Sequence, residues 1–332
     1  MKCRWHGYIE AQGEKEVDAV VAFLISIPIS PLLSLLFEGI DRKLHARMQK
    51  RIGPPVLQPF YDLIKLLGKE RIIPATASTR IFEIMPMVST ASSLLGASIL
   101  LSNILSNSNI VGDLILIIYL LAMSSIALIV GGSASGNPYS AIGFSRKISM
   151  MIAYEIPMLI AVISMAFGPS PSLAVSSIIE FQVSRGLPLV ASRLSMALAA
   201  AAFLLCIPAA ASVVPFDIPE AKTEIIYGFL IEYGGPYLAL AKVSKSVLNF
   251  TLTLLASAIF LYIPSLLGEA ALLNLGLSLF LCLIVSLLIM FITITVPRTV
   301  LARLKVGQAL KFYWVLPLTL SFSSIILSAV NL

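Results

Sequence analysis

Charged residues are scarce in this chain. They make up 12% of its 332 residues, while hydrophobic residues make up 58% and the mean hydropathy is +0.96. A soluble globular domain carries about 25% charged residues, so we expect an all-α, polytopic integral membrane protein. The net charge of +6 does not indicate nucleic-acid binding, because the basic residues lie in short loops beside hydrophobic runs.

Cysteine and histidine are also scarce, which argues against several cofactors. Cys3, Cys206 and Cys282 lie far apart without a CxxC pair, so neither an iron–sulfur cluster nor a zinc site is predicted. His6 and His45 lie outside the hydrophobic runs, so the pair of axial ligands that a transmembrane haem needs is missing. We expect no cofactor and no metal in this chain.

Hydrophobic runs of about 20 residues, enough for a helix to cross a bilayer, recur eight times. No linker or repeat divides the chain, so residues 1–332 are predicted to form a single membrane domain. Its start has no small-residue cleavage site and does not resemble a removable signal peptide. The predicted spans are 19–38, 82–104, 112–131, 149–167, 194–214, 238–265, 273–297 and 312–331.

The distribution of lysine and arginine predicts the orientation. The loops after the first, third, fifth and seventh spans hold 16 of these residues, whereas the N-terminal segment and the other loops hold five. Basic loops stay on the cytoplasmic side. We therefore expect a multi-pass protein of the plasma membrane with both termini outside.

The first cytoplasmic loop, residues 38–81, is the longest and most basic. Lys43, Arg47 and Lys50 recur at helical spacing before the helix-breaking residues 53–55. Anionic lipid headgroups could explain each charge singly, whereas docking of a partner would explain the whole set. The candidate docking residues are Arg42, Lys43, Arg47, Lys50, Arg51, Gln58 and Asp62, with Glu38 and Asp41 as auxiliary acids.

A short amphipathic helix is predicted at about 55–70, on the cytoplasmic side. It is too short and too polar to span, so it should lie in the plane of the interface. Its hydrophobic residues are Val56, Leu57, Phe60, Leu63, Ile64 and Leu67, opposite Gln58, Asp62, Lys65 and Lys69.

Glu155 lies inside the fourth predicted span, two residues before Pro157. An ionisable group at that depth costs a few kcal/mol unless it is paired or hydrated, and it usually serves a function. A structural hydrogen bond between helices is the alternative. Lys242 and Lys245 could pair with such acids or extend to the headgroups. Asp113 and Glu269, at outer ends of spans, are expected to be solvated.

Residues 214–236 gather most of the remaining acids. Asp217, Pro219 and Glu220 are typical of a helix start, and Gly234-Gly235-Pro236 is typical of a helix end. Asp217, Glu220 and Glu224 would then share one helical face. The spacing by itself fits a well-capped interfacial helix whose acids face water.

Four segments carry a resemblance to a known family: DRKLHARMQKRIGPPVLQPFYDLIKLLGKE at 41–70, KISMMIAYEIP at 147–157, PFDIPEAKTEIIYGFLIEYGGPYLAL at 215–240 and VPRTVLARLKVGQALKFYWVLPLTL at 296–320. The chain resembles the family of the complex I membrane subunit that is called NADH dehydrogenase subunit 1 in mitochondria. It is most similar to the equivalent subunits of archaeal membrane-bound nickel–iron hydrogenases and related sulfur-reducing complexes.

The resemblance implies a subunit between a peripheral redox arm and an ion-pumping membrane arm. Its partners would be hydrogenase-like large and small subunits, an iron–sulfur subunit, antiporter-like membrane subunits and lipid. Any iron–sulfur cluster or nickel–iron site would lie in those partners. The matching acids Glu155, Asp217, Glu220, Glu224 and Glu232 would line a hydrated path into the membrane.

Two departures from the family pattern matter. The motif GPPVLQP is shorter than the form typical of quinone-reducing complex I, which favours the hydrogenase-like branch. Lys222 stands where many relatives carry glutamate, so a base replaces one acid of the path. Three hypotheses stay open: a non-catalytic coupling subunit for protons or sodium, a quinone-binding subunit, and a stand-alone secondary transporter, although no internal repeat favours the last.

The topology can be tested by cysteine labelling in intact cells. A Lys69→Cys variant should be protected from an impermeant thiol reagent, because position 69 is expected in the cytoplasm, while Gln12→Cys should react. Labelling of position 69 with protection of position 12 would reverse the predicted orientation.

Overall fold

The computed structural model describes residues 2–106, 114–169, 172–263 and 271–330, and most of these residues are helical. The long helices are α1 (Lys2–Met48), α3 (Thr79–Ser106), α4 (Leu114–Ser133), α5 (Pro138–Ala166), α8 (Leu194–Ala210), α10 (Gly235–Phe260), α11 (Ala271–Met290) and α13 (Val306–Ala329). The shorter elements are α2 (Gln58–Leu67), α6 (Val175–Arg185), α7 (Leu189–Ser192), α9 (Lys222–Ile225) and α12 (Val296–Val300), with 3-10 turns η1 (Ile218–Glu220) and η2 (Gly228–Leu230) and a π-helical turn η3 (Phe291–Thr295).

Each of the eight predicted spans coincides with a helix, which confirms the all-α membrane architecture. Within the described ranges, seven helical segments are long and apolar enough to cross a membrane. The exception is α8, which has only 17 residues and is therefore roughly 25 Å long. The predicted fourth span starts too late, because α5 begins at Pro138, behind an Asn137 cap that accepts a hydrogen bond from the Tyr139 amide.

The chain leaves the helical conformation after α8 while it is still inside the protein. Ala211, Ser212 and Phe216 are buried, and Ser212 adopts a left-handed backbone conformation with φ of 51°. Irregular backbone at membrane depth is tolerated where protein surrounds it. The fifth span is therefore completed by a buried, non-helical segment rather than by a longer helix.

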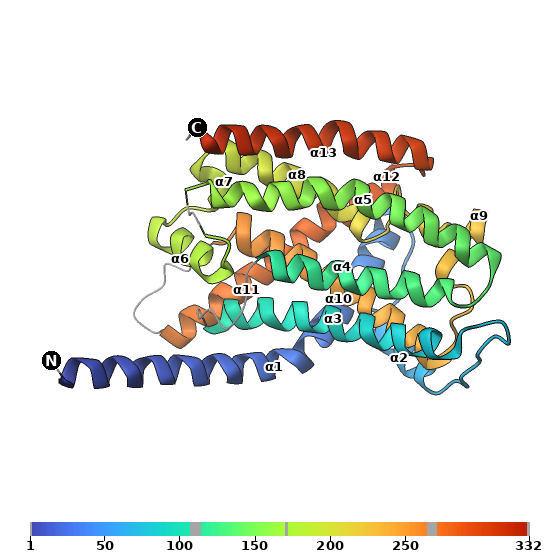
Figure 1. Cartoon of the computed structure of the whole chain (residues 1–332), viewed down its shortest axis with the longest axis horizontal. Coiled ribbons are helices and arrows are strands. Elements are labelled where there is room, and N and C mark those ends of the chain that lie inside the picture. The colour runs from blue at the N-terminus through green and yellow to red at the C-terminus, as the bar shows by residue number, and fades with distance from the viewer. Residues whose placement is uncertain (1, 107–113, 170–171, 264–270, 331–332) are drawn as a thin grey trace.

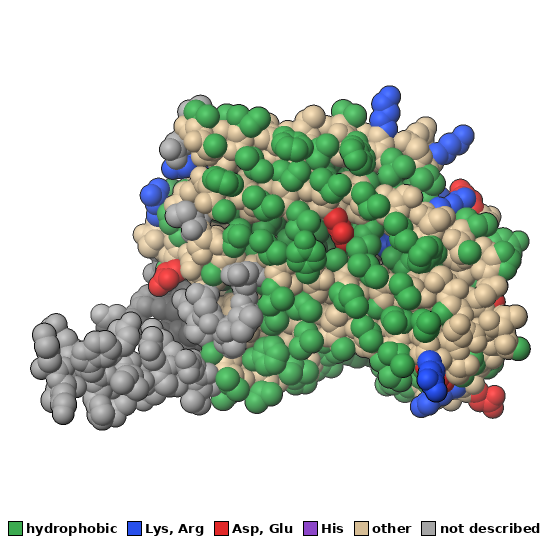
Figure 2. Space-filling view, viewed as in Figure 1, with side chains coloured by type: hydrophobic (Ala, Val, Ile, Leu, Met, Phe, Trp, Pro, Cys, Tyr) green, Lys and Arg blue, Asp and Glu red, His purple; other side chains and the backbone are tan. Residues whose placement is uncertain are grey.

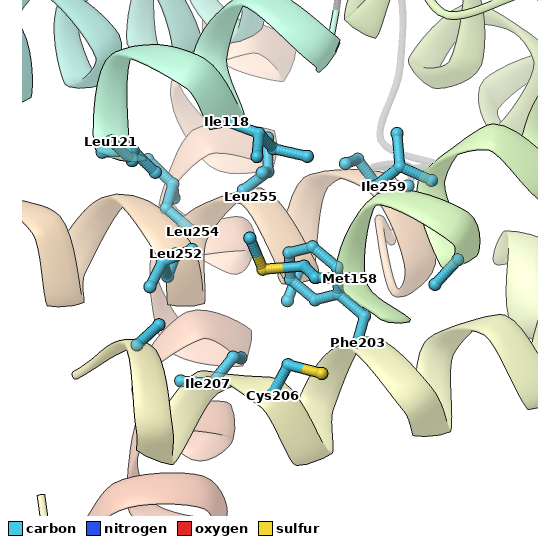
Figure 3. Packing of buried hydrophobic residues seen from close by; sticks show 14 of the residues in the cluster. Ile118, Leu121, Met158, Phe203, Cys206, Ile207, Leu252, Leu254, Leu255 and Ile259 are labelled. Atoms are coloured by element: carbon cyan, nitrogen blue, oxygen red, sulfur yellow. The ribbon is translucent and has the colours of Figure 1, made fainter. Parts of the chain in front are cut away.

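The centre of the bundle is α10, whose side chains are mostly buried. It packs against α1, α3, α8 and α11. Leu252 and Leu255 of α10 meet Ile118 of α4 and Phe203 of α8 in a common hydrophobic core (Figure 3). This core holds in fixed positions the helices that carry the charged residues described below.

The two termini lie at the same end of the bundle, and α2 and α9 lie at the opposite end (Figure 1). We call the latter the α2 end. This arrangement agrees with the even number of predicted spans. Which end faces the cytoplasm stays a prediction from the basic residues.

The predicted amphipathic helix is present as α2 and is attached to the bundle by charge. Arg42 of α1 contacts Glu38 one turn earlier and donates to Asp62 of α2 at 2.8 Å. Gln58 donates to the other Asp62 oxygen at 3.1 Å. Gly39 of α1 allows the chain leading into α2 to approach, since a Cβ there would lie 1.9 Å from the Val56 carbonyl oxygen.

The Asp62 carboxylate makes this attachment sensitive to acid. Partial burial opposes its charged form, but hydrogen bonds from Arg42 and Gln58, with the charges of Arg42 and Lys242, lower its pKa below the ordinary value. A carboxylate with a lowered folded-state pKa contributes stability above its unfolded pKa. That contribution is lost as the pH falls through the lowered value.

We expect Asp62→Asn to loosen α2 at neutral pH, because it removes the charge that holds Arg42. A spin label on the exposed Tyr61→Cys position should become mobile in this variant at every pH. With Asp62 intact, the label should stay immobile until the pH falls below about 4, the ordinary aspartate pKa. Lys43→Gln, an exposed neighbour of Arg42, is the matched control, and an immobile label in Asp62→Asn would refute the attachment.

Candidate functional site

Residues 214–234 do not form the predicted single helix. The structure breaks them into η1, α9 and η2, separated by Ala221 with ψ of 107° and by Ile226 and Tyr227 with positive φ. The capping residues near Asp217 thus start only one turn. Burial of Ile225, Phe229 and Leu230 fixes a path that a continuous helix could not follow, so the prediction of three acids on one face was wrong.

The Gly-Gly-Pro sequence at 234–236 was also misread, because it begins a helix rather than ending one. Gly234 is the N-terminal cap of α10, and proline stands in the first turn, where its missing amide hydrogen costs nothing. Gly228, earlier in the segment, lies very close to the backbone of η1. It has φ of 55°, and a Cβ there would lie 2.2 Å from the Pro219 carbonyl oxygen. Gly228 therefore serves tight packing, whereas Gly234 has open space around it.

Each acid of residues 214–234 bonds to a different part of the bundle. Glu220 accepts from Lys245 of α10 at 2.5 Å, and Glu224 from Arg146 of α5 at 2.6 Å. The remaining bonds are Asp217 to Arg303 at 2.7 Å and Glu232 to Asn137 at 2.6 Å. The segment is thus held by α5, by α10, by the connection before α13 and by the turn before α5.

Sequence reasoning missed Lys147, which it assigned to a cytoplasmic loop. The side chain belongs to α5 and is only 4% exposed. Its ammonium lies 2.5 Å from the Ser212 hydroxyl and 5.8 Å from the centre of the Tyr154 ring. The spacing in the sequence could have indicated this position. Lys147 precedes Glu155 by only eight residues, which is roughly 12 Å along the axis of one continuous helix.

A small cavity joins Lys147 to the Glu220–Lys245 pair. It measures about 20 Å³ and also touches Ser124, Ser125 and Asn249. The side-chain amide oxygen Oδ1 of Asn249 is buried and has no hydrogen-bond partner among the described residues. A polar space of this size accommodates a water molecule, and water there would satisfy Asn249.

Glu155 borders a second cavity of about 10 Å³. The two cavities share Ser125, Ala210 and Leu248 as lining residues, so they lie on either side of a thin wall. Figure 2 shows a mostly hydrophobic surface over α4, α5 and α13, interrupted near its middle by an acidic group. Glu155 is the one acid in α4 and α5, and it is half-buried.

The auxiliary acids are internal rather than part of a free surface. Glu38 accepts from Ser246 of α10 as well as from Arg42. Asp41 is buried and accepts from Thr295 of η3 at 2.6 Å and from Arg298 of α12 at 3.2 Å. These contacts attach the end of α1 to α10 and to the π-helical turn.

The two remaining predicted bases have different surroundings. Lys242 is exposed, and its charge acts on Asp62. Lys222 is exposed and lies over the Tyr227 ring at 4.9 Å, without an ion pair to an acid in the described ranges. Asp113 and Glu269 fall outside the described residues.

The predicted docking residues divide into two groups. Arg42, Gln58 and Asp62 bond to one another and hold α2 in place. The others project from the α2 end and are exposed: Lys43, Arg47, Lys50 and Arg51. Cys206 and Cys282 are buried free thiols, and no group of three metal-binding side chains occurs among the residues searched, those that the structure describes.

Comparison with known proteins agrees with the resemblance seen in the sequence. Residues 20–329 match the family model described as NADH dehydrogenase. The H subunit of NADH-quinone oxidoreductase from Thermomicrobium roseum is 34% identical over 266 residues, covering 73% of this chain and 78% of that protein. Its counterpart from Syntrophotalea carbinolica is 33% identical over 306 residues, covering 87% and 88%.

A solved structure extends the similarity to three dimensions. It is described as the membrane-bound sulfane sulfur reductase (MBS), an archaeal respiratory membrane complex. One of its chains matches with a TM-score of 0.82 and 28% identity over 93% of this chain and 99% of that chain. Since the family model matches nearly the whole sequence, the chain belongs to the NADH dehydrogenase family of complex I membrane subunits.

Proposed function

We propose that this membrane subunit of a complex I-related respiratory complex couples electron transfer in a peripheral arm to proton translocation. The observation that carries the proposal is the run of polar and charged groups from Glu220 and Lys245, through Lys147, to Glu155. It begins at a segment near the α2 end and reaches an acid 17 residues into α5, roughly 26 Å along that helix.

The charges in this run suit a coupled relay. Glu220 and Lys245 form an ion pair, Lys147 is a buried cation, and Glu155 is a half-buried acid. Charges so close in a low-dielectric surrounding influence one another strongly. A proton arriving at one site therefore changes the electrostatic potential at the next.

Protons suit the first cavity better than sodium ions. Two ammonium groups, those of Lys147 and Lys245, line a space of about 20 Å³. A sodium ion would meet repulsion from both and would need several oxygen ligands in a space fit for a single water. We assign proton transfer to this path and leave sodium movement, if the complex performs it, to other membrane subunits.

A peripheral redox arm is proposed to dock on the α2 end, which we place on the cytoplasmic side. Four basic residues are exposed at this end: Lys43, Arg47, Lys50 and Arg51. Two apolar residues are exposed there as well, Ile52 to 83% and Ile72 to 67%. A basic surface with protruding apolar side chains suits a protein partner better than water. In this proposal the redox cofactors belong to the arm and none to this chain.

Quinone binding is the second candidate, because relatives at 33–34% identity are subunits of NADH-quinone oxidoreductases. The two cavities on the charged run, about 20 and 10 Å³, are far below the several hundred Å³ of a small-molecule site. A quinone would therefore have to bind outside the charged run. The short GPPVLQP motif favours an arm of the hydrogenase or sulfur-reductase type, and membership of the family sets aside the stand-alone transporter.

Replacing Glu155 tests the relay. Glu155→Gln should leave the complex assembled and electron transfer from soluble donors largely intact. Proton translocation in sealed vesicles should fall by about tenfold or more, since loss of a proton-transfer group costs on the order of 10²-fold in rate.

The matched control is Glu180→Gln, which changes an exposed acid of α6 at the other end of the bundle and should translocate normally. Full translocation by a Glu155→Gln, Glu224→Gln double variant would show that these carboxylates are structural only.

Charge reversal tests the docking surface. Replacement of Arg47, Lys50 and Arg51 together by glutamate should reduce the copurified arm by about tenfold or more, because like charges facing each other cost several kcal/mol. Arg185→Glu, an exposed base of α6, is the control. Undiminished copurification with the triple variant would place the arm elsewhere.

A further inference from the structure

An open groove lies between α5 and α13, apart from the charged run described above. It has a volume of about 410 Å³ and is lined by Ser149 and Ile152 of α5 and by Leu310, Lys311 and Trp314 of α13. Ile152 and Trp314 are each about half exposed. The groove therefore combines a cation, an indole, a hydroxyl and an apolar floor.

We place this groove at the level of the lipid headgroups, because the hydrophobic runs of both helices begin there, although α5 itself starts earlier, at Pro138. The hydrophobic run in α5 begins at residue 149, and the run in α13 begins at residue 312, so Ser149 and Lys311 stand at matching boundaries. Tryptophan and lysine are enriched at this depth, where an amphipathic ring and an ammonium meet the interface. Figure 2 shows basic groups at one end of the hydrophobic surface over α13.

Lys311 offers a positive charge that the described protein residues leave uncompensated. Neighbouring bases on this side are engaged: Arg303 with Asp217, and Arg146 with Glu224. Lys311 has no ion pair in the described ranges, and its side chain is exposed. An anionic group would therefore complement it.

The Ser149 hydroxyl narrows the choice of headgroup. It donates to the Ser145 carbonyl oxygen at 2.9 Å, which commits its hydrogen to the helix. The Ser149 oxygen is left as an acceptor, so the ligand that meets it should bring a donor. Hydroxyl groups on a lipid headgroup supply such donors next to a phosphate.

We propose that this groove binds one anionic phospholipid with a hydroxyl-bearing headgroup, of the phosphatidylglycerol type. The phosphate lies at Lys311, a headgroup hydroxyl donates to Ser149, and an acyl chain lies along Ile152, Leu310 and Trp314. A choline headgroup lacks the donor and brings a second positive charge toward Lys311. A partner helix would have to carry an acid at the interface and fill the open space, and it is the competing occupant.

Native mass spectrometry of the intact complex, released from nanodiscs that contain phosphatidylglycerol in phosphatidylcholine, tests the site. Lys311→Gln should weaken retention of one phosphatidylglycerol by about fivefold, the effect of one lysine near an anionic headgroup. Ser149→Ala should weaken it less, and the retention of phosphatidylcholine should not change. Lys305→Gln removes an exposed charge six residues earlier that does not line the groove, and it should match the unaltered complex.

A photo-cross-linking residue at Ile152 distinguishes the two occupants independently of ion pumping. A cross-link to lipid is expected, and a cross-link to another subunit would overturn the proposal in favour of a partner helix. Equal phosphatidylglycerol retention by the Lys311→Gln and unaltered complexes would also overturn it. Both readouts stand whether or not the complex translocates protons.

Discussion

The structure depends on one constraint: a charge held inside a membrane bundle needs an opposite charge or a polar partner. The ion pair of Glu220 with Lys245 meets this requirement near the α2 end, and the contact of Lys147 with Ser212 meets it deeper in the bundle. Breaking a buried pair leaves the remaining charge uncompensated, which costs several kcal/mol. The pairs therefore fix the positions of the elements that carry them.

This constraint explains why residues 214–234 lack regular structure. Their acids contact bases and amides from separate elements, so the backbone follows the positions of its partners rather than a helical repeat. The same segment contributes Glu220 to the cavity that Lys147 lines. Any displacement of the segment changes the electric field at Lys147, which gives a physical route from the α2 end of the protein to its interior.

The rest of the fold keeps this charged run in a fixed geometry. α10 is buried on nearly all sides and supplies Lys245 and Asn249 from one rigid helix. The hydrophobic core between α4, α5, α8 and α10 surrounds the path. Arg42, Asp41 and their partners fasten α2 and the end of α1 to this frame. The frame is apolar, so the few polar groups inside it determine where water and protons can pass.

The sequence by itself determined the membrane class, the eight hydrophobic helices, the amphipathic α2 and the family. These rest on composition and on periodicity over many residues, and single contacts do not alter them. Glu155 was also identifiable, because an acid within a hydrophobic run is conspicuous whatever surrounds it. The pairing of Lys245 with an acid was one of two options that the sequence left open.

Only the tertiary structure decided which groups meet. Lys147 was mistaken for a loop residue because the hydrophobic run starts at 149, whereas α5 starts at Pro138. The helix expected after Asp217 was broken because burial of Phe229 and the bases on α5 and α10 outweighed local capping. Gly-Gly-Pro at 234–236 fits a helix end or start equally well by local chemistry. Packing of α10 in the centre of the bundle selected the start.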